Sequence, residues 1–256
     1  MDSQPTKPGL GCSLLLLLLL LTAGTATPAG AQDESSASAW TLGAELDANS
    51  RYLWRGMAFS EGAVYQPSLT LGRGAWSVNA WANVEPHALV GSRWNELDVT
   101  LSAATEWRGW SFEPSAMVYS YPGTGADATA EVQLDIRHAF GAWTPYTIHS
   151  VDLVEARGAA YSAFGMEVEH AIRGSITMEA HAEYGRGWWR FASWYADPAL
   201  EGMNVWSAGV SSTIALANGI SLRPHAGWNR VGNRPIRDFI SGPTPFTFGL
   251  ALGREF

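Results

Sequence analysis

Apolar and polar residues alternate one by one through most of the chain. Near the end, Phe246, Phe248, Leu250 and Leu252 fall on even positions, while small or polar residues occupy the odd positions. A period of two residues predicts a β-strand with one apolar face. The same alternation predicts twelve strands, at residues 40–54, 63–72, 75–84, 95–107, 110–121, 130–140, 143–154, 159–170, 176–184, 204–216, 220–230 and 246–256. In the segment 143–154 neither parity is clearly apolar, so this strand is ambiguous.

The connections between these strands alternate in length. Those after every second strand are a few residues long and nearly all contain glycine; Asn218-Gly219 is the clearest two-residue hairpin turn. The other connections are usually longer. Short turns at one rim and longer loops at the other are typical of a transmembrane antiparallel up-and-down β-barrel, in which the last strand pairs with the first. The alternative is a secreted β-sandwich that ends in a strand.

The composition of the polar face indicates which side of the predicted strands points into the barrel and which side points to lipid. It is rich in Glu, Asp, Gln, Ser, Thr and Asn, so we expect it to line a wet lumen while the apolar face meets lipid. This assignment makes the lumen acidic and predicts a preference for cations or neutral solutes if it is open. The predicted pore-lining residues are Glu45, Asp47, Glu96, Asp98, Glu106, Glu131, Asp135, Arg137, Glu167, Glu169, Glu179, His181, Glu183 and Arg223.

Whether such a lumen is open does not follow from the pattern. Eight strands leave an interior that side chains fill and sixteen leave an aqueous channel, so twelve lie between. Inward Tyr119, Tyr146, Tyr161 and His181 are candidates to fill it. Each lumen charge also has a purely structural alternative, an internal salt bridge or hydrogen bond that satisfies a buried polar group.

Composition supports the membrane interpretation. The chain has 13 Trp, many at the ends of periodic segments, as expected of aromatic girdles at two water interfaces. Residues 1–31 have the features of a cleaved export signal, with Lys7, a leucine run at 14–21 and a small-residue site at 29–31. Residues 32–39 are a short linker and 40–256 the barrel. Without the signal the chain has no cysteine and no lysine and keeps a net charge of −8, which disfavours nucleic acid.

Short motifs add a family resemblance. Residues 49–57, which include Tyr52, Trp54, Arg55 and Gly56, and the later segments 81–84, 96–98 and 121–123 resemble the TorF-type porin family, also catalogued as the Gcw_chp conserved hypothetical proteins. The resemblance implies an outer-membrane porin with no established catalytic residues. We expect Arg55 and Gly56 at the outer rim, where Arg55 pairs with a lumen acid and Gly56 lets the first loop fold inward, or where Arg55 anchors the interface. The terminal Phe256 resembles the assembly signal of outer-membrane barrels.

Two other functions were weighed. The aromatic loop 185–203 suits a closed barrel that acts as an adhesin or receptor, because exposed Trp and Tyr favour protein or carbohydrate contact. An outer-membrane lipid hydrolase is less favoured, since the chain contains no His-x-Ser motif and the adjacent His149 and Ser150 point to opposite faces of a strand.

The sequence therefore predicts a porin of the cell outer membrane in a Gram-negative-type envelope, and not an enzyme. Its expected partners are the lipid bilayer, the outer-membrane assembly machinery and small solutes, with no nucleic acid. We expect neither cofactor nor metal. Glu179, His181 and Glu183 share one face, but alternate residues of a strand lie roughly 6–7 Å apart, which is wide for a single ion.

Overall fold

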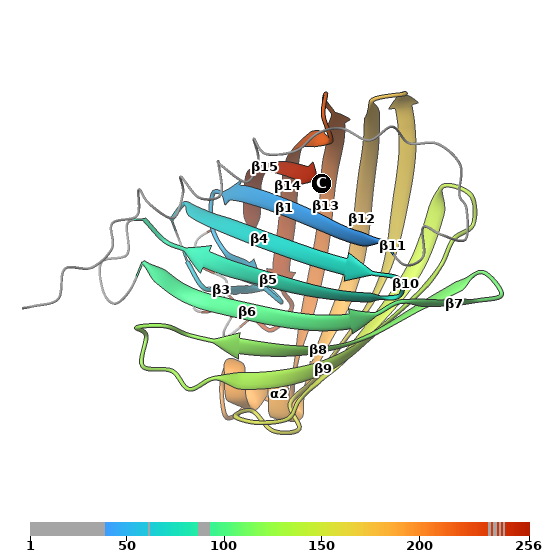
Figure 1. Cartoon of the computed structure of the whole chain (residues 1–256). Coiled ribbons are helices and arrows are strands. Elements are labelled where there is room, and N and C mark those ends of the chain that lie inside the picture. The colour runs from blue at the N-terminus through green and yellow to red at the C-terminus, as the bar shows by residue number, and fades with distance from the viewer. Residues whose placement is uncertain are drawn as a thin grey trace, which may run out of the picture.

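The strands form one antiparallel sheet that closes on itself (Figure 1). The computed structural model describes residues 39–60, 62–86, 93–234, 237, 240, 242 and 244–256; the predicted signal peptide and most of the linker lie outside them. In this part of the chain twelve strands make up the barrel, with β6 and β7 counted as one because only Ala104 separates them. The barrel strands are β1 (Trp40–Asn49), β4 (Val64–Arg73), β5 (Trp76–Val84), β6 (Trp94–Ala103), β7 (Thr105–Trp107), β8 (Trp110–Ser120), β9 (Thr129–His138), β10 (Trp143–Asp152), β11 (Ala160–Arg173), β12 (Ile176–Trp188), β13 (Gly202–Ala215), β14 (Ile220–Val231) and β15 (Phe246–Glu255).

The last strand closes the barrel, as its alternation predicts. β15 pairs with β14 on one side and with β1 on the other, where Leu46 lies opposite Leu252. The backbone N–H of Phe256 donates to the carbonyl oxygen of Leu42 at 2.9 Å. Closure leaves no unpaired edge in the sheet, which a barrel needs in an apolar surrounding.

Apolar side chains point out and carboxylates point in. On β15, Phe246, Phe248 and Leu250 are exposed, and the same outward exposure holds for Leu69, Leu71, Val78, Val99, Leu101, Val118, Val132, Phe164, Met178 and Val210. The inward Glu131 is only 3% exposed. A protein with this arrangement needs hydrocarbon around it, because a continuous apolar belt in water is unfavourable.

Tryptophan rings lie at both rims of the barrel. Trp40, Trp76, Trp107, Trp110 and Trp143 are exposed beside the short turns, and Trp188 and Trp206 beside the long loops. The short turns have the backbone that tight hairpins need: Asn218 (φ 61°) and Gly219 (φ 70°) both adopt positive φ between β13 and β14. We call the two ends of the barrel the short-turn rim and the long-loop rim.

The largest differences between predicted and observed strand ends are in the first and the ninth predicted strands. The first strand was expected to continue to residue 54, but β1 ends at Asn49. The ninth was expected to end at 184, whereas β12 continues to Trp188 and leads directly into α2 (Trp189–Tyr195). The ambiguous segment is β10, whose inward face carries Tyr146 and Ile148. Its alternation is blurred because part of the lumen beside it is apolar.

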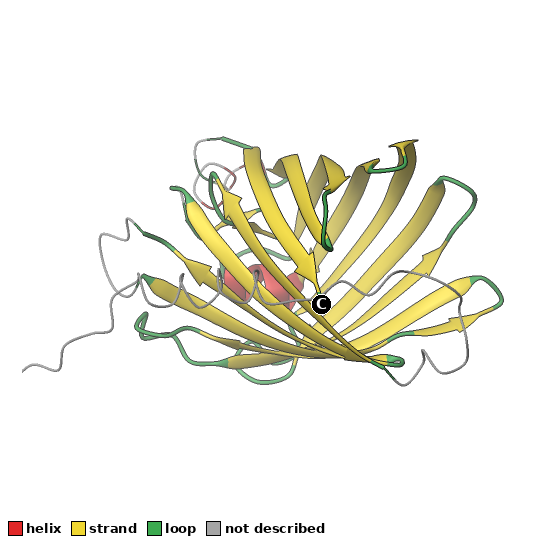
Figure 2. Ribbon diagram, turned by 45° about the horizontal axis from the view of Figure 1, so that its top comes forward, coloured by secondary structure: helices red, strands yellow, loops and turns green. Residues whose placement is uncertain are grey.

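Among the described residues, no helix is long and apolar enough to cross a membrane. The short α2 lies inside the ring of strands (Figure 2).

Candidate functional site

The chain after β1 turns back into the lumen. β2 (Leu53–Trp54) and β3 (Met57–Ala58) form a small hairpin whose base is closed by the backbone N–H of Phe59, which donates to the Tyr52 carbonyl at 2.9 Å. Tyr52 and Trp54 had been expected on the outward face of a long first strand. They lie inside the barrel instead, because the chain reverses direction before them. Beyond this point the alternation of polar and apolar residues no longer indicates which side chains face lipid.

The tip of the hairpin crosses the lumen and is fastened to the opposite wall. The Arg55 guanidinium donates to both carboxylate oxygens of Glu131 on β9, at 2.9 and 2.5 Å, and to the Ser150 hydroxyl on β10 at 2.8 Å. It also lies 4.3 Å from the ring centre of Trp54 and 4.6 Å from that of Tyr161. A bidentate Arg–carboxylate pair with ring contacts is among the strongest polar attachments in proteins. The expected pairing of Arg55 with a lumen acid is present, deeper than the rim.

Gly56 fits a position that no other residue can occupy. Arg55 and Gly56 both have positive φ, 48° and 80°, as the central residues of a type I′ turn. A Cβ atom on Gly56 would lie 2.9 Å from methyl groups of Val205 on β13 and Val231 on β14. The hairpin therefore contacts the barrel wall through bare backbone.

The helix α2 packs against the hairpin from the neighbouring side of the lumen. Phe191 is 1% exposed, and its ring centre lies 5.8 Å from that of Trp54 and 5.4 Å from that of Tyr161. We call residues 52–59 together with α2 the plug. The apolar cluster that joins the plug to the wall contains Met57, Ala156, Ala159, Tyr161, Ala163, Phe191, Ala192, Met203, Val205, Val231 and Ile240.

A buried carboxylate holds the end of α2 to the wall. Asp152, 1% exposed at the end of β10, accepts hydrogen bonds from the Thr129 hydroxyl at 2.6 Å and from the Tyr195 hydroxyl at 3.5 Å. Burial and the Asp152 carboxylate raise the pKa of Tyr195 above its ordinary value, so this phenol stays protonated and continues to donate.

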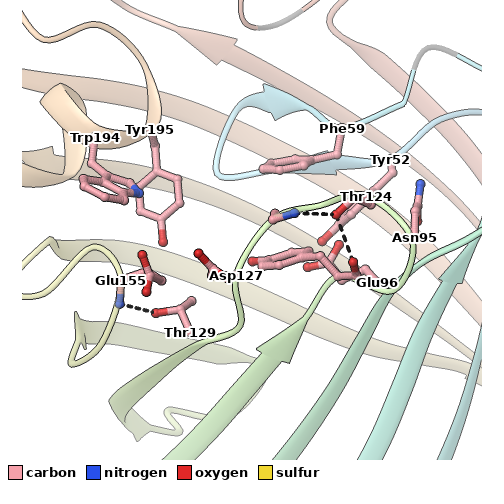
Figure 3. Close-up of a pocket in the computed structure, with 12 residues that line it drawn as sticks. Tyr52, Phe59, Asn95, Glu96, Thr124, Asp127, Thr129, Glu155, Trp194 and Tyr195 are labelled. Carbon is pink, nitrogen blue, oxygen red and sulfur yellow. Dashed lines mark hydrogen bonds between the residues drawn. The ribbon is translucent and has the colours of Figure 1, made fainter. Parts of the chain in front are cut away.

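The plug leaves three neighbouring cavities in the lumen, which share Trp54, Phe59, Glu96, Tyr119, Tyr121 or Tyr195 in their linings. The outer cavity, at the long-loop rim, has a volume of about 400 Å³ and is bordered by Tyr52, Tyr121 and α2 (Figure 3). The inner cavity, beyond the plug, has about 270 Å³. Between them lies a space of only about 10 Å³, roughly one water molecule. This constriction is lined by Trp54, Phe59, Glu96, Tyr119, Tyr121 and Tyr195.

The lumen acids divide into paired and unpaired groups. Glu45 forms a salt bridge with Arg223 at 2.8 Å and Asp47 contacts His225 at 3.0 Å. Arg137 joins Asp135 and Glu167 at 2.9 and 2.8 Å. Four further predicted residues form no salt bridge to a described basic side chain. They are Glu96, Asp98, Glu179 and Glu183.

The remaining predicted residues lie in the lumen or close to the short-turn rim. His181 faces inward against Gly209, and Glu183 accepts a hydrogen bond from the Tyr146 hydroxyl at 2.9 Å. Glu106 and Glu169 are exposed close to the short-turn rim. Within the described part of the chain, no three His, Cys, Asp or Glu side chains are arranged to hold a metal ion.

His149 and Ser150 point to opposite faces of β10, as expected. Ser150 lies in the lumen beside Arg55, and His149 lies on the outer face, where its Nδ1 is 2.9 Å from the Ser162 hydroxyl of β11. Its Nε2 is 3.0 Å from the Thr147 hydroxyl. Hydroxyl groups occupy both ring nitrogens, so no carboxylate orients this imidazole as the base of a serine nucleophile.

Comparison with solved structures relates this geometry to known barrels. The KdgM porin superposes with a TM-score of 0.50 at 10% identity, over 84% of this chain and 99% of that one. The NanC porin gives 0.51 at 9%, over 83% and 98%, and an outer membrane channel from Pseudomonas putida F1 gives 0.51 at 11%, over 88% and 100%. The chain has the fold of outer-membrane porins. No protein-family model and no curated protein sequence matches it.

Several residues of the site were not singled out from the sequence. Asp152 and Ser150 belong to the ambiguous strand, and Asp127, Thr129 and Glu155 to loops or loop edges. One signal was available: the polar residues of segment 143–154 are unusually mixed with aromatic and aliphatic ones, which indicates a strand that faces packed protein on its inner side.

Proposed function

We propose that this protein is an outer-membrane channel for passive diffusion of small solutes, with a preference for cationic or neutral ones. The observation that carries the proposal is the lumen itself: two cavities in series, of about 400 and 270 Å³, separated by a space of about one water molecule. The acids that border these cavities are Glu96, Asp127, Glu155 and Glu183, and none of them forms a salt bridge to a described basic side chain. Acidic groups along the path favour cations over anions.

The outer membrane is the location that the surface favours. The exposed apolar belt and the two sets of rim tryptophans suit a bilayer, and the porin fold belongs to proteins of that membrane. We further propose membership of the TorF-type porin family and recognition of Phe256 by the barrel assembly machinery. Phe256 is compatible with this role because it directly follows β15, the strand that closes the barrel, and its N–H donates to the Leu42 carbonyl of β1.

The plug sets the size limit of the channel. With the hairpin in place, the constriction admits water and small ions; larger solutes require movement of Trp54 and Phe59, which the hairpin carries. The attachment of Arg55 to Glu131 is then the contact that keeps the passage narrow.

Planar-bilayer recording of the purified barrel tests this function. Residues 53–58 can be replaced by two glycines, because the Tyr52 carbonyl and the Phe59 N–H already lie within 2.9 Å. We expect the intact protein to give small, cation-selective currents, seen as a reversal potential in a salt gradient, and the variant to give several-fold larger ones. Folding of both is checked by heat-dependent migration on gels.

Other outcomes would support different functions. The exposed Trp189 and Trp194 of α2 favour the receptor alternative. A barrel that carries no current with or without the hairpin, and binds a partner that it loses when α2 is removed, would replace the channel by an adhesin or receptor. Anion-selective currents would contradict the role of the unpaired carboxylates.

A further inference from the structure

The outer cavity has the walls of a binding site and not only of a water-filled vestibule. Aromatic rings from three separate segments border it. Phe59 follows the hairpin strands, and Trp194 and Tyr195 belong to α2 (Figure 3). Tyr121 directly follows β8. Trp194 is 55% exposed and Phe59 45%. Large rings that remain exposed in a concave site mark the surfaces on which ligands pack.

All charged residues that border this cavity are acidic. They are Glu96, Asp127 and Glu155, and none of the twelve described lining residues is basic. Glu96 is 6% exposed, with the Tyr52 hydroxyl as its hydrogen-bond partner and no salt bridge among the described residues. A buried carboxylate in this position lacks a counter-charge.

A second carboxylate without a basic partner, Asp98, lies two residues from Glu96 on the inward face of β6. The Oδ1 atom of Asp98 is buried, and no hydrogen-bond donor of the described residues reaches it. Two inward carboxylates, two residues apart and without a basic partner, are destabilised by each other and by burial. A cation held beside Glu96, which borders the outer cavity, would reduce both effects for this carboxylate.

The combination of rings and carboxylates selects one ligand class. Aromatic faces attract cations through the ring quadrupole, most strongly when the cation is weakly hydrated, as an organic ammonium is. A hydrated metal ion has no need of the rings, and an anion is repelled by the carboxylates. We propose that the outer cavity is a binding site for small organic ammonium ions, with the rings around the cation and Glu96 as its counter-charge. This inference rests on the proposed channel, in which the site is the first station of the passage.

Isothermal titration calorimetry on the full barrel in detergent tests the site. The probe is benzyltrimethylammonium chloride, compared with benzyl alcohol, benzoate and glucose. We expect saturable binding of the ammonium ion only. Glu96→Gln, which keeps the shape of the side chain, should weaken binding about tenfold, and Trp194→Ala roughly threefold. Glu113→Gln is the matched control, because this acid lies at the opposite mouth of the barrel, and should leave binding unchanged.

The result separates this inference from the channel itself. Ammonium binding without conductance would support the binding site and contradict the proposed channel function. Conductance without saturable ammonium binding would contradict the binding site and support the channel. Equal binding of benzyl alcohol or glucose, or an unchanged affinity in Glu96→Gln, would show that rings alone hold the ligand and would overturn the assignment to cations.

Discussion

Replacement of Arg55 by alanine is the sharpest probe of the plug. The side chain makes three hydrogen bonds across the lumen, two to Glu131 and one to Ser150, and contacts the rings of Trp54 and Tyr161. Its loss leaves Glu131, 3% exposed, as a buried carboxylate without a counter-charge and with only the Tyr119 hydroxyl, at 3.5 Å, as a hydrogen-bond donor. The Arg55→Ala variant keeps the barrel wall intact, because Arg55 belongs to the loop and not to a barrel strand.

The size of the effect follows from the burial of the pair. Removal of one member of a buried ion pair costs about 3–5 kcal/mol. If this cost falls on the closed position of the hairpin, the ratio of open to closed channels rises by a factor of about 10² to 4 × 10³, since about 1.4 kcal/mol corresponds to tenfold. Single-channel recording should show a large rise in the fraction of time spent open.

A double-mutant cycle assigns the effect to the pair. Glu131→Gln alone should also open the channel, and the double variant should be no more open than Arg55→Ala, because contacting residues do not add. Arg137→Ala serves as the control, since Arg137 links Asp135 and Glu167 along the wall and does not contact the plug. If Arg55→Ala and Arg137→Ala alter the open fraction equally, the reasoning about the hairpin is refuted.

Two further predictions concern the hairpin turn and the lipid face. Gly56→Ala should loosen the hairpin and enlarge the current, because the added Cβ would lie 2.9 Å from Val205 and Val231 at a positive φ; a current equal to that of the native protein would show that the turn has room. Val99→Arg, on the outward face of β6, should lower the free energy of unfolding in lipid vesicles by about 2–4 kcal/mol, whereas Thr100→Arg, on the lumen side, should cost less. Equal losses at both positions would contradict the assigned orientation.

The barrel could be predicted from the sequence because successive side chains of a strand point to opposite faces, so the alternation of polarity shows which residues share a face. The alternation from Phe246 to Leu252 gave the closing strand, and the Asn218-Gly219 turn gave the hairpin between β13 and β14. Both signals are local, and both survive because lipid and lumen impose opposite polarity on neighbouring residues.

The interior could not be predicted in the same way. Tyr52 and Trp54 continue the alternation of the first strand, so the pattern predicts that they point outward. In the structure the chain bends at residues 50–51, and both side chains lie inside the barrel. The partner of Arg55 is 76 residues away, and nothing in either segment specifies the other. The outer cavity combines loops, a hairpin and a short helix, and its walls depend on how these segments fold back, which periodicity does not encode.

The attachment of Arg55 also orders the events of biogenesis. The hairpin is synthesised just after the first strand, but its anchors Glu131 and Ser150 follow 76 and 95 residues later, and the valines beneath Gly56 come from β13 and β14. An incomplete barrel therefore has nowhere to seat the hairpin. Docking of the hairpin in the lumen must therefore be among the last steps of folding. Each molecule completes its barrel wall before the hairpin narrows the passage.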